Sequence, residues 1–118
     1  MRIYIIMPYG RRRGLSDAEC EKNIEKAIEV ARQLILMGHE PLLPHLLHFI
    51  HKGWAQSPSE ERWAYIAAIQ LLAAEAVLVT GEIQDSDEGS NMRKELAQAK
   101  IMTKKIFYSL QEVKDDKV

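Results

Sequence analysis

The sequence has one cysteine, no long apolar segment and almost no net charge, and each shortage excludes a class of protein. Cys20 alone cannot form an intrachain disulfide, so a reducing compartment fits the chain. The formal net charge of −1 gives no bulk attraction to nucleic-acid polymers or anionic membranes. No apolar run approaches the roughly 20 residues that span a bilayer, and residues 3–7 are too few for a signal-peptide core. We therefore expect a cytoplasmic protein that binds neither membranes nor nucleic-acid polymers.

The length and composition of the chain suit one globular domain. It has 118 residues, of which 47% are hydrophobic, and this is enough for one core but hardly for two. There is no internal repeat, no low-complexity block and no interdomain linker. We assign residues 1–110 to the domain and residues 111–118 to a charged C-terminal tail that should fray.

Short β-rich runs alternate with longer amphipathic segments along the chain. Residues 2–7, 39–44, 76–80 and 105–109 are typical of strands, and the first is apolar enough to be buried on both faces. Pro41 cannot donate to a ladder, so the second strand should begin there or lie at an exposed edge. Strands that alternate with helices indicate a parallel sheet. We expect an α/β, Rossmann-like (flavodoxin-like) three-layer sandwich with a four- to five-stranded parallel sheet.

The expected helices have recognisable starting signals. Ser16 and Glu19 match a capping box, and Gly38 supplies the stop of that helix. Two further helices are expected to begin after Ser59 and Ser90. The stripe predicted to face the core in the first helix consists of Ile24, Ala27, Ile28, Ala31, Leu34 and Ile35.

Two loops should lie where an open parallel sheet binds ligands, beyond the carboxyl ends of its strands. Residues 8–15 carry Arg11, Arg12 and Arg13 between glycines, and residues 81–90 lead into a helix N-terminus that favours an anion. Together they indicate a site for a phosphate or a polar sugar. A solvated loop explains the arginines equally well.

Glu95 is the carboxylate best placed to reach such a ligand. It borders the apolar stripe of Met92, Leu96 and Ala99, so it should lean toward the sheet at the rim of the cleft. A carboxylate there is partly shielded and still touches a ligand. Judged on spacing alone, a glutamate early in a helix more often only complements the helix dipole.

Three segments carry a resemblance to a known family. They are residues 4–10 (YIIMPYG), 38–45 (GHEPLLPH) and 89–95 (GSNMRKE), the last followed by Ala97 and Ala99. In order and spacing they resemble the nucleoside 2-deoxyribosyltransferase-like superfamily over about residues 2–109. Within it, the chain is most similar to small single-domain members of the DUF4406 type.

The resemblance implies roles for individual residues. Glu95 matches the glutamate that attacks the anomeric carbon of a nucleoside, and Tyr4 matches a first-strand tyrosine that orients that carboxylate. Arg11 or Arg13 lies near a loop arginine that holds a 5′-phosphate in nucleotide-hydrolysing relatives. The other expected substrate-binding residues are Pro8, Tyr9, Gly10, His45, Gly89, Ser90 and Asn91.

Three positions depart from the family pattern. Asn91 replaces the usual glycine four residues before the glutamate, and asparagine tolerates a left-handed conformation. Met7 stands where a small residue is usual. Ala67 lies near the position of an aspartate that engages the base, which leaves the acid for the departing base unassigned. The acidic residues available to take its place, in the loop before Glu95, are Asp85, Asp87 and Glu88.

The resemblance implies cleavage or transfer at the N-glycosidic bond of a nucleoside or nucleotide, through a glutamate nucleophile. An alternative is a non-catalytic module that binds nucleotides or nucleoside derivatives, in which Glu95 contacts ribose hydroxyls. A third is an interaction domain with a vestigial cleft. The expected partners are a small-molecule nucleoside or nucleotide and further copies of the chain, in a homodimer or higher homo-oligomer whose neighbour closes the site.

No cofactor and no metal are expected. His45, His48 and His51 follow at steps of three, which drift round a helix instead of converging. We expect His45 to line the cleft and the other two to be partly exposed. The apolar run at residues 46–50 suggests an oligomer contact. Trp54 and Trp63 fit either a base-stacking lid or a subunit interface.

Overall fold

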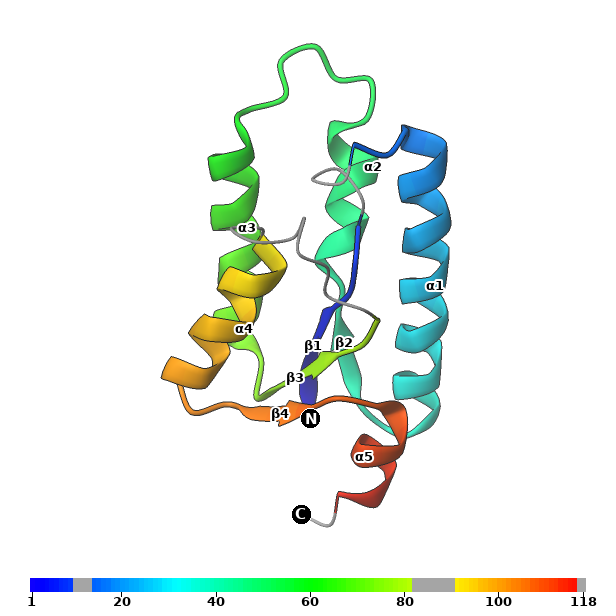
Figure 1. The fold of residues 1–118 in the computed structure, drawn as a ribbon, viewed down its shortest axis with the longest axis vertical. Helices are drawn as coiled ribbons and strands as arrows, with labels where there is room; N and C mark the ends of the chain where they lie inside the picture. Colours follow the sequence, from blue (N-terminus) through cyan, green and yellow to red (C-terminus); the bar gives the residue numbers. More distant parts are fainter. Residues whose placement is uncertain (10–13, 82–90, 117–118) are drawn as a thin grey trace.

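A computed structural model shows an open parallel sheet between two layers of helices (Figure 1). The structure describes residues 1–9, 14–81 and 91–116, without the side chain of Asn91. The strands lie in the order β2–β1–β3–β4 and pair in parallel, which is the order of the flavodoxin-like fold. The predicted fold class is therefore confirmed. The strands are β1 (Arg2–Ile6), β2 (Glu40–Leu42), β3 (Ala76–Val79) and β4 (Lys105–Phe107).

The helices cover both faces of this sheet. α1 and α5 pack on one face, and α3 and α4 pack on the other (Figure 1). No helix in the described ranges is long and apolar enough to cross a membrane. The helices are α1 (Asp17–Leu36), the short 3-10 turn η1 (Pro44–Leu46), α2 (Leu47–His51), α3 (Glu60–Ala73), α4 (Asn91–Ile101) and α5 (Leu110–Asp115).

β1 runs through the middle of the sheet, which explains its continuous apolar sequence. Ile3 and Ile5 point into the core under α1, whereas Tyr4 and Ile6 point into the core under α3 and α4. All four side chains are at most 1% exposed. The prediction of a strand buried on both faces is confirmed, and it places Tyr4 on the same side of the sheet as α4.

The predicted signals of α1 are confirmed except at one position. The Ser16 hydroxyl accepts the Glu19 N–H and the Glu19 carboxylate accepts the Ser16 N–H, so both halves of the capping box form. Gly38 follows the helix with a φ of +89°, which only glycine adopts readily. Ile35, predicted to face the core, is 58% exposed because it lies about 100° around the helix from the buried Leu34. Ile28, which follows the buried Ala27 in the same way, is only partly buried.

The second strand agrees with expectation, whereas the segment after residue 110 differs from it. β2 is an edge strand, which is one of the two placements that Pro41 predicts. Residues 111–115, however, do not fray. They belong to α5, which Ser109 caps by accepting the Glu112 N–H. Val113 is 2% exposed in the core beside α1. Burial of this side chain stabilises a segment that was expected to fray because it is charged.

Candidate functional site

The loops that follow β1 and β3 touch at the carboxyl edge of the sheet. Gly81 has a φ of +86°, and a Cβ atom there would lie 2.8 Å from the Pro8 Cδ atom. Only glycine permits both the left-handed backbone and this close approach. The segment after β1 is therefore held against the segment that leads toward α4. This is the edge at which the sequence predicts a ligand.

Glu95 on α4 and Tyr4 on β1 interact across the layer between helix and sheet. Tyr4 is fully buried and Glu95 is partly buried. Burial raises the pKa of Glu95 to about 7, and hydrogen bonding to the Tyr4 hydroxyl opposes part of that rise. Burial also raises the pKa of the Tyr4 hydroxyl, and the Glu95 carboxylate raises it further. The structure thus brings together the two residues predicted to be catalytic.

The contact between these two groups is loose. Among the described residues, the Tyr4 hydroxyl has no hydrogen-bond partner of ordinary geometry, although it lies close enough to couple to the Glu95 charge. A buried hydroxyl without a well-formed hydrogen bond costs about 1–3 kcal/mol. Contacts of this kind often tighten only when a ligand is present. A bound ligand could therefore complete the hydrogen bond between the Tyr4 hydroxyl and the Glu95 carboxylate.

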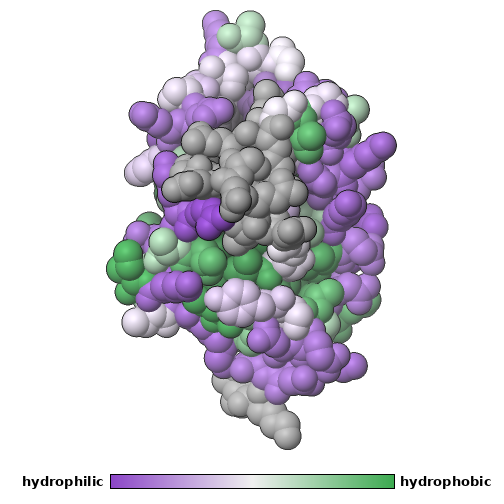
Figure 2. All heavy atoms as spheres, in the orientation of Figure 1, coloured by the Kyte–Doolittle hydropathy of each residue, from purple (hydrophilic) through white to green (hydrophobic). Residues whose placement is uncertain are grey.

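Glu95 also forms part of the wall of a groove between α3 and α4. The groove has a volume of about 290 Å³. Its lining is mainly apolar, which explains why water stabilises the Glu95 carboxylate poorly. Figure 2 shows hydrophobic residues in a band across the middle of the face in view, with mostly hydrophilic residues above and below it. The residues around the groove are Ala64, Ala68, Leu71, Leu72, Lys94, Glu95, Gln98 and Met102.

The raised pKa of Glu95 makes the stability of the fold depend on pH. Its pKa is about 7 in the folded protein against a model-compound value of 4.5. Between these values the folded protein holds a proton that the unfolded chain has lost, so stability falls as the pH rises from 4.5 to 7. Glu95→Gln should remove this fall. We expect similar unfolding free energies near pH 4.5, and a variant more stable by on the order of 1–3 kcal/mol at pH 8.

Urea unfolding at the two pH values measures this difference. Glu25→Gln, at an exposed position of α1, is the matched control and should change stability little at either pH. An advantage of Glu95→Gln that is the same at acidic and alkaline pH would contradict the burial of a carboxyl group at this position.

His45 supports the segment after β1 from the other side. It is buried at 8% exposure, and its Nε2–H donates to the Met7 carbonyl at 2.9 Å. Burial lowers the pKa of this imidazole, so its neutral form is favoured. In that form Nδ1 is a buried acceptor, which has no partner among the residues described here. Its expected role in substrate binding stays a prediction.

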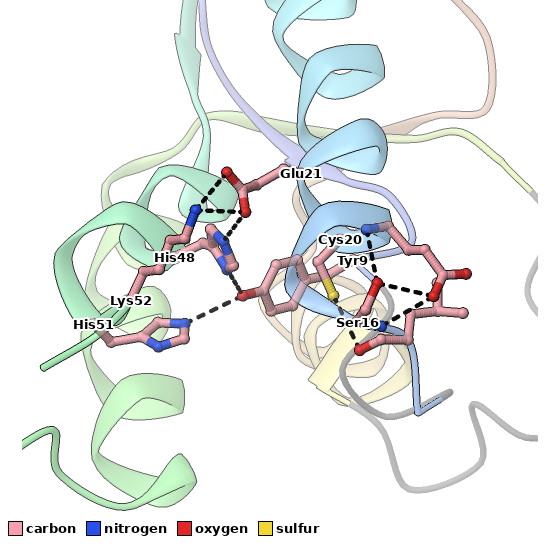
Figure 3. Close-up of polar contacts among 9 residues, drawn as sticks. Tyr9, Ser16, Cys20, Glu21, His48, His51 and Lys52 are labelled. Atoms are coloured by element: carbon pink, nitrogen blue, oxygen red, sulfur yellow. Dashed lines mark hydrogen bonds and ion pairs between the residues drawn. The ribbon is translucent and has the colours of Figure 1, made fainter. Parts of the chain in front are cut away.

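A second polar cluster surrounds Tyr9 (Figure 3). The Tyr9 hydroxyl contacts His48 Nδ1 and lies 3.1 Å from His51 Nε2. His48 Nε2 lies 3.4 Å from a Glu21 carboxylate oxygen, which also pairs with Lys52 at 2.9 Å. His48 is 2% exposed, so the expectation that it is partly exposed is wrong. Its imidazole is buried because the polar partners replace water around it.

The spacing of the histidines did not predict that His48 and His51 converge on Tyr9. His45 belongs to a 3-10 turn, which repeats every three residues and so places steps of three on one face. His48 and His51 follow in a helix of a little more than one turn, too short for the drift to separate them. Pro44 at the start of a short helical segment was the available signal. In the described part of the chain, no set of three metal-binding side chains is arranged to hold an ion.

One protein family matches almost the whole chain. The family described as Domain of unknown function (DUF7768) matches residues 1–109. The chain belongs to this family. The DUF7768 match does not bear on the narrower DUF4406 resemblance, which stays a prediction. No curated protein matches the chain.

The DUF7768 domain also resembles a solved structure. This is a 2-deoxyribosyltransferase from the bacterium Bacillus psychrosaccharolyticus, with a TM-score of 0.59 and 16% sequence identity. The likeness covers 90% of this chain and 69% of the transferase chain. At this identity it shows a shared Rossmann-like fold. That enzyme is described as a biocatalyst for the synthesis of antiviral and antitumoral nucleosides.

Several predicted site residues of the DUF7768 domain lie outside the described ranges. The side chain of Asn91, at the start of α4, is also not described. Ala67, which the resemblance to the nucleoside 2-deoxyribosyltransferase-like superfamily places near an acid position, is 7% exposed on α3 and provides no proton donor. The residues outside the described ranges are Gly10, Arg11, Arg13, Asp85, Asp87, Glu88, Gly89 and Ser90.

Proposed function

We propose that this DUF7768 domain binds a nucleoside or nucleotide at the carboxyl edge of its sheet and cleaves or transfers its N-glycosidic bond. The pairing of Glu95 with the Tyr4 hydroxyl is the observation that carries the proposal. A carboxyl group with a pKa of about 7 is ionised in a large fraction of molecules at neutral pH, so it can attack as a carboxylate. The transferase-like fold supports the same assignment.

The proposed reaction has two steps at C1′ of the sugar. A Glu95 oxygen forms a bond to C1′ as the C1′–N bond breaks, and the electron pair of that bond leaves with the base, which takes up a proton. Water or a second base then attacks C1′ and releases the Glu95 carboxylate. The Tyr4 hydroxyl orients the attacking oxygen. Arg11 or Arg13 and the N-terminus of α4 would hold the sugar or its 5′-phosphate.

A non-catalytic binding module is the second candidate, and one observation favours it. Ala67, which the resemblance places near the usual acid position, is buried and provides no proton donor. Protonation of the leaving base would then depend on Asp85, Asp87, Glu88 or water. If none of these reaches the base, Glu95 would bind sugar hydroxyls without breaking a bond.

We further propose that a second copy of the chain closes the site. Large apolar residues are exposed on α3 and α4, the two helices that form the groove lined by Glu95. Exposed apolar residues of this size often mark an interface. Leu72 is 63% exposed, Ile69 51% and Ile101 75%. Burial of these side chains between copies would also remove water from the carboxylate.

Incubation with deoxynucleosides and their 5′-monophosphates tests the proposed function. Chromatography should detect free base, or a new nucleoside when a second base is supplied. Thermal-shift measurements with the same compounds separate the two candidates, because a binding module is stabilised by intact nucleotide and releases no base over hours. Neither release nor stabilisation with any of these compounds would contradict both functions.

A further inference from the structure

The segment after β1 is held by hydrogen bonds from two helices. His45 donates to the Met7 carbonyl at 2.9 Å, and Asn23 of α1 donates to the Tyr9 carbonyl at 2.9 Å. The Tyr9 hydroxyl then reaches His48 and His51 of α2. His45 follows β2 and Gly81 follows β3, and these two strands flank β1 on opposite sides. The backbone at residues 7–9 therefore accepts hydrogen bonds from η1 and α1, and the Tyr9 side chain contacts α2.

The contacts around Tyr9 are consistent with the following assignment of hydrogens. Hydrogen bonding to Lys52 and, more weakly, to His48 lowers the pKa of Glu21, so Glu21 is an ionised acceptor. His48 Nε2 lies 3.4 Å from that carboxylate without a hydrogen bond of ordinary geometry among the described residues, and a hydrogen on Nε2 is the arrangement that the negative charge favours. In a neutral His48, Nδ1 is then the acceptor for the Tyr9 hydroxyl, and His51 Nε2–H donates to the Tyr9 oxygen. All donors point the same way along the chain of contacts.

This chain of contacts resembles the carboxylate–imidazole–hydroxyl order in which a carboxylate sets the tautomer of a histidine. Here the hydroxyl points toward α2, as Figure 3 shows, and is engaged by two imidazoles. Its role is therefore to anchor the ring of Tyr9. A fully buried imidazole is a costly way to fill space, because an apolar side chain of the same volume needs no partners. The imidazole, unlike an apolar side chain, fixes the orientation of the Tyr9 side chain by contacting its hydroxyl.

We propose that His48, oriented by Glu21, is a positioning residue that locks the Tyr9 hydroxyl and so holds Pro8 and Tyr9 in the place where the ligand binds. This inference rests on the proposed function, because Pro8 and Tyr9 matter only if the carboxyl edge of the sheet is the binding site. His48 touches no ligand in this scheme. It acts through Tyr9, and Lys52 acts one step further away by holding Glu21.

Two amide substitutions at position 48 separate positioning from packing. Asparagine places its amide near Nδ1 and keeps a partner for Tyr9, whereas glutamine reaches toward Nε2 and keeps only the partner for Glu21. We expect His48→Gln and Tyr9→Phe to raise the KM for a deoxynucleoside 5′-monophosphate about tenfold, more than they lower kcat. His48→Asn should stay within about threefold of the original protein. Tyr65→Phe, at an exposed tyrosine of α3, is the control for loss of a phenolic hydroxyl.

Amide hydrogen exchange of the peptide over residues 1–15 gives a readout that needs no ligand. His48→Gln should exchange faster there than His48→Asn, while exchange in β3 and β4 stays equal in the two variants. Equal exchange and equal KM in the two amide variants would overturn the positioning role. If the original protein binds and cleaves no nucleotide but the exchange difference is present, the proposed function fails and the lock on Tyr9 stands.

Discussion

Glu95→Gln should abolish the release of free base, with kcat lower by about 10³-fold or more. The amide has the shape of the carboxyl group but lacks the charge and the nucleophilic oxygen that must bond to C1′. Because the variant is nearly isosteric, nucleotide binding should fall far less than turnover. The measurement is base release under saturating deoxynucleoside 5′-monophosphate, followed by chromatography. Full activity in Glu95→Gln would refute the assignment of the nucleophile.

Tyr4→Phe provides the matched comparison for this experiment. It keeps the carboxylate and removes only the hydroxyl, whose hydrogen bonding opposes the rise in the pKa of Glu95. The pKa of Glu95 should therefore rise further in the variant. Since the attacking form is the carboxylate, the acid limb of the plot of rate against pH should move to higher pH. An unchanged pH profile would show that Tyr4 does not touch the reacting group.

Gly81→Ala should destabilise the fold by about 2–4 kcal/mol and weaken nucleotide binding. Gly81 has a left-handed backbone with a φ of +86°, which alanine adopts only with strain. The added Cβ atom would also lie 2.8 Å from the Pro8 Cδ atom. Neither strain relaxes without moving the segment after β1 away from the loop that follows β3. Thermal unfolding should show a fall in Tm of about 10 °C. Nucleotide affinity, measured on the folded variant, should fall with it.

Gly53→Ala separates the two sources of strain. Gly53 has a similar φ of +71°, but a Cβ there would meet no atom within 4 Å. Its replacement should therefore cost only the left-handed backbone, about 1 kcal/mol. Equal losses in the two variants would mean that the contact between Pro8 and Gly81 contributes nothing to the fold.

The orientations of Tyr4 and Glu95 were predictable, because local sequence patterns determine on which face of a strand or helix a side chain lies. Alternation in β1 indicates that Tyr4 shares a face with Ile6, and helical spacing indicates that Glu95 borders the buried stripe of α4. Their meeting needs only the parallel order of β1 and β3, which the alternation of strands and helices implies. The histidine cluster was not predictable in the same way. It depends on a short turn after Pro44 and on Glu21, which lies on another helix and gives no signal in the sequence.

The sequence by itself determined the fold class, the edge position of β2, the start of α1 and the candidate pair of Tyr4 and Glu95. The first three follow from period, capping and turn chemistry, which act over a few neighbouring residues, whereas the pairing of Tyr4 with Glu95 is what the resemblance to the nucleoside 2-deoxyribosyltransferase-like superfamily implies. Only the tertiary structure decided that Glu95 has a pKa of about 7, that His48 is buried against Tyr9, and that α5 packs on the core. Each of these depends on contacts between residues far apart in the chain, because burial and charge pairing are set by neighbours in space.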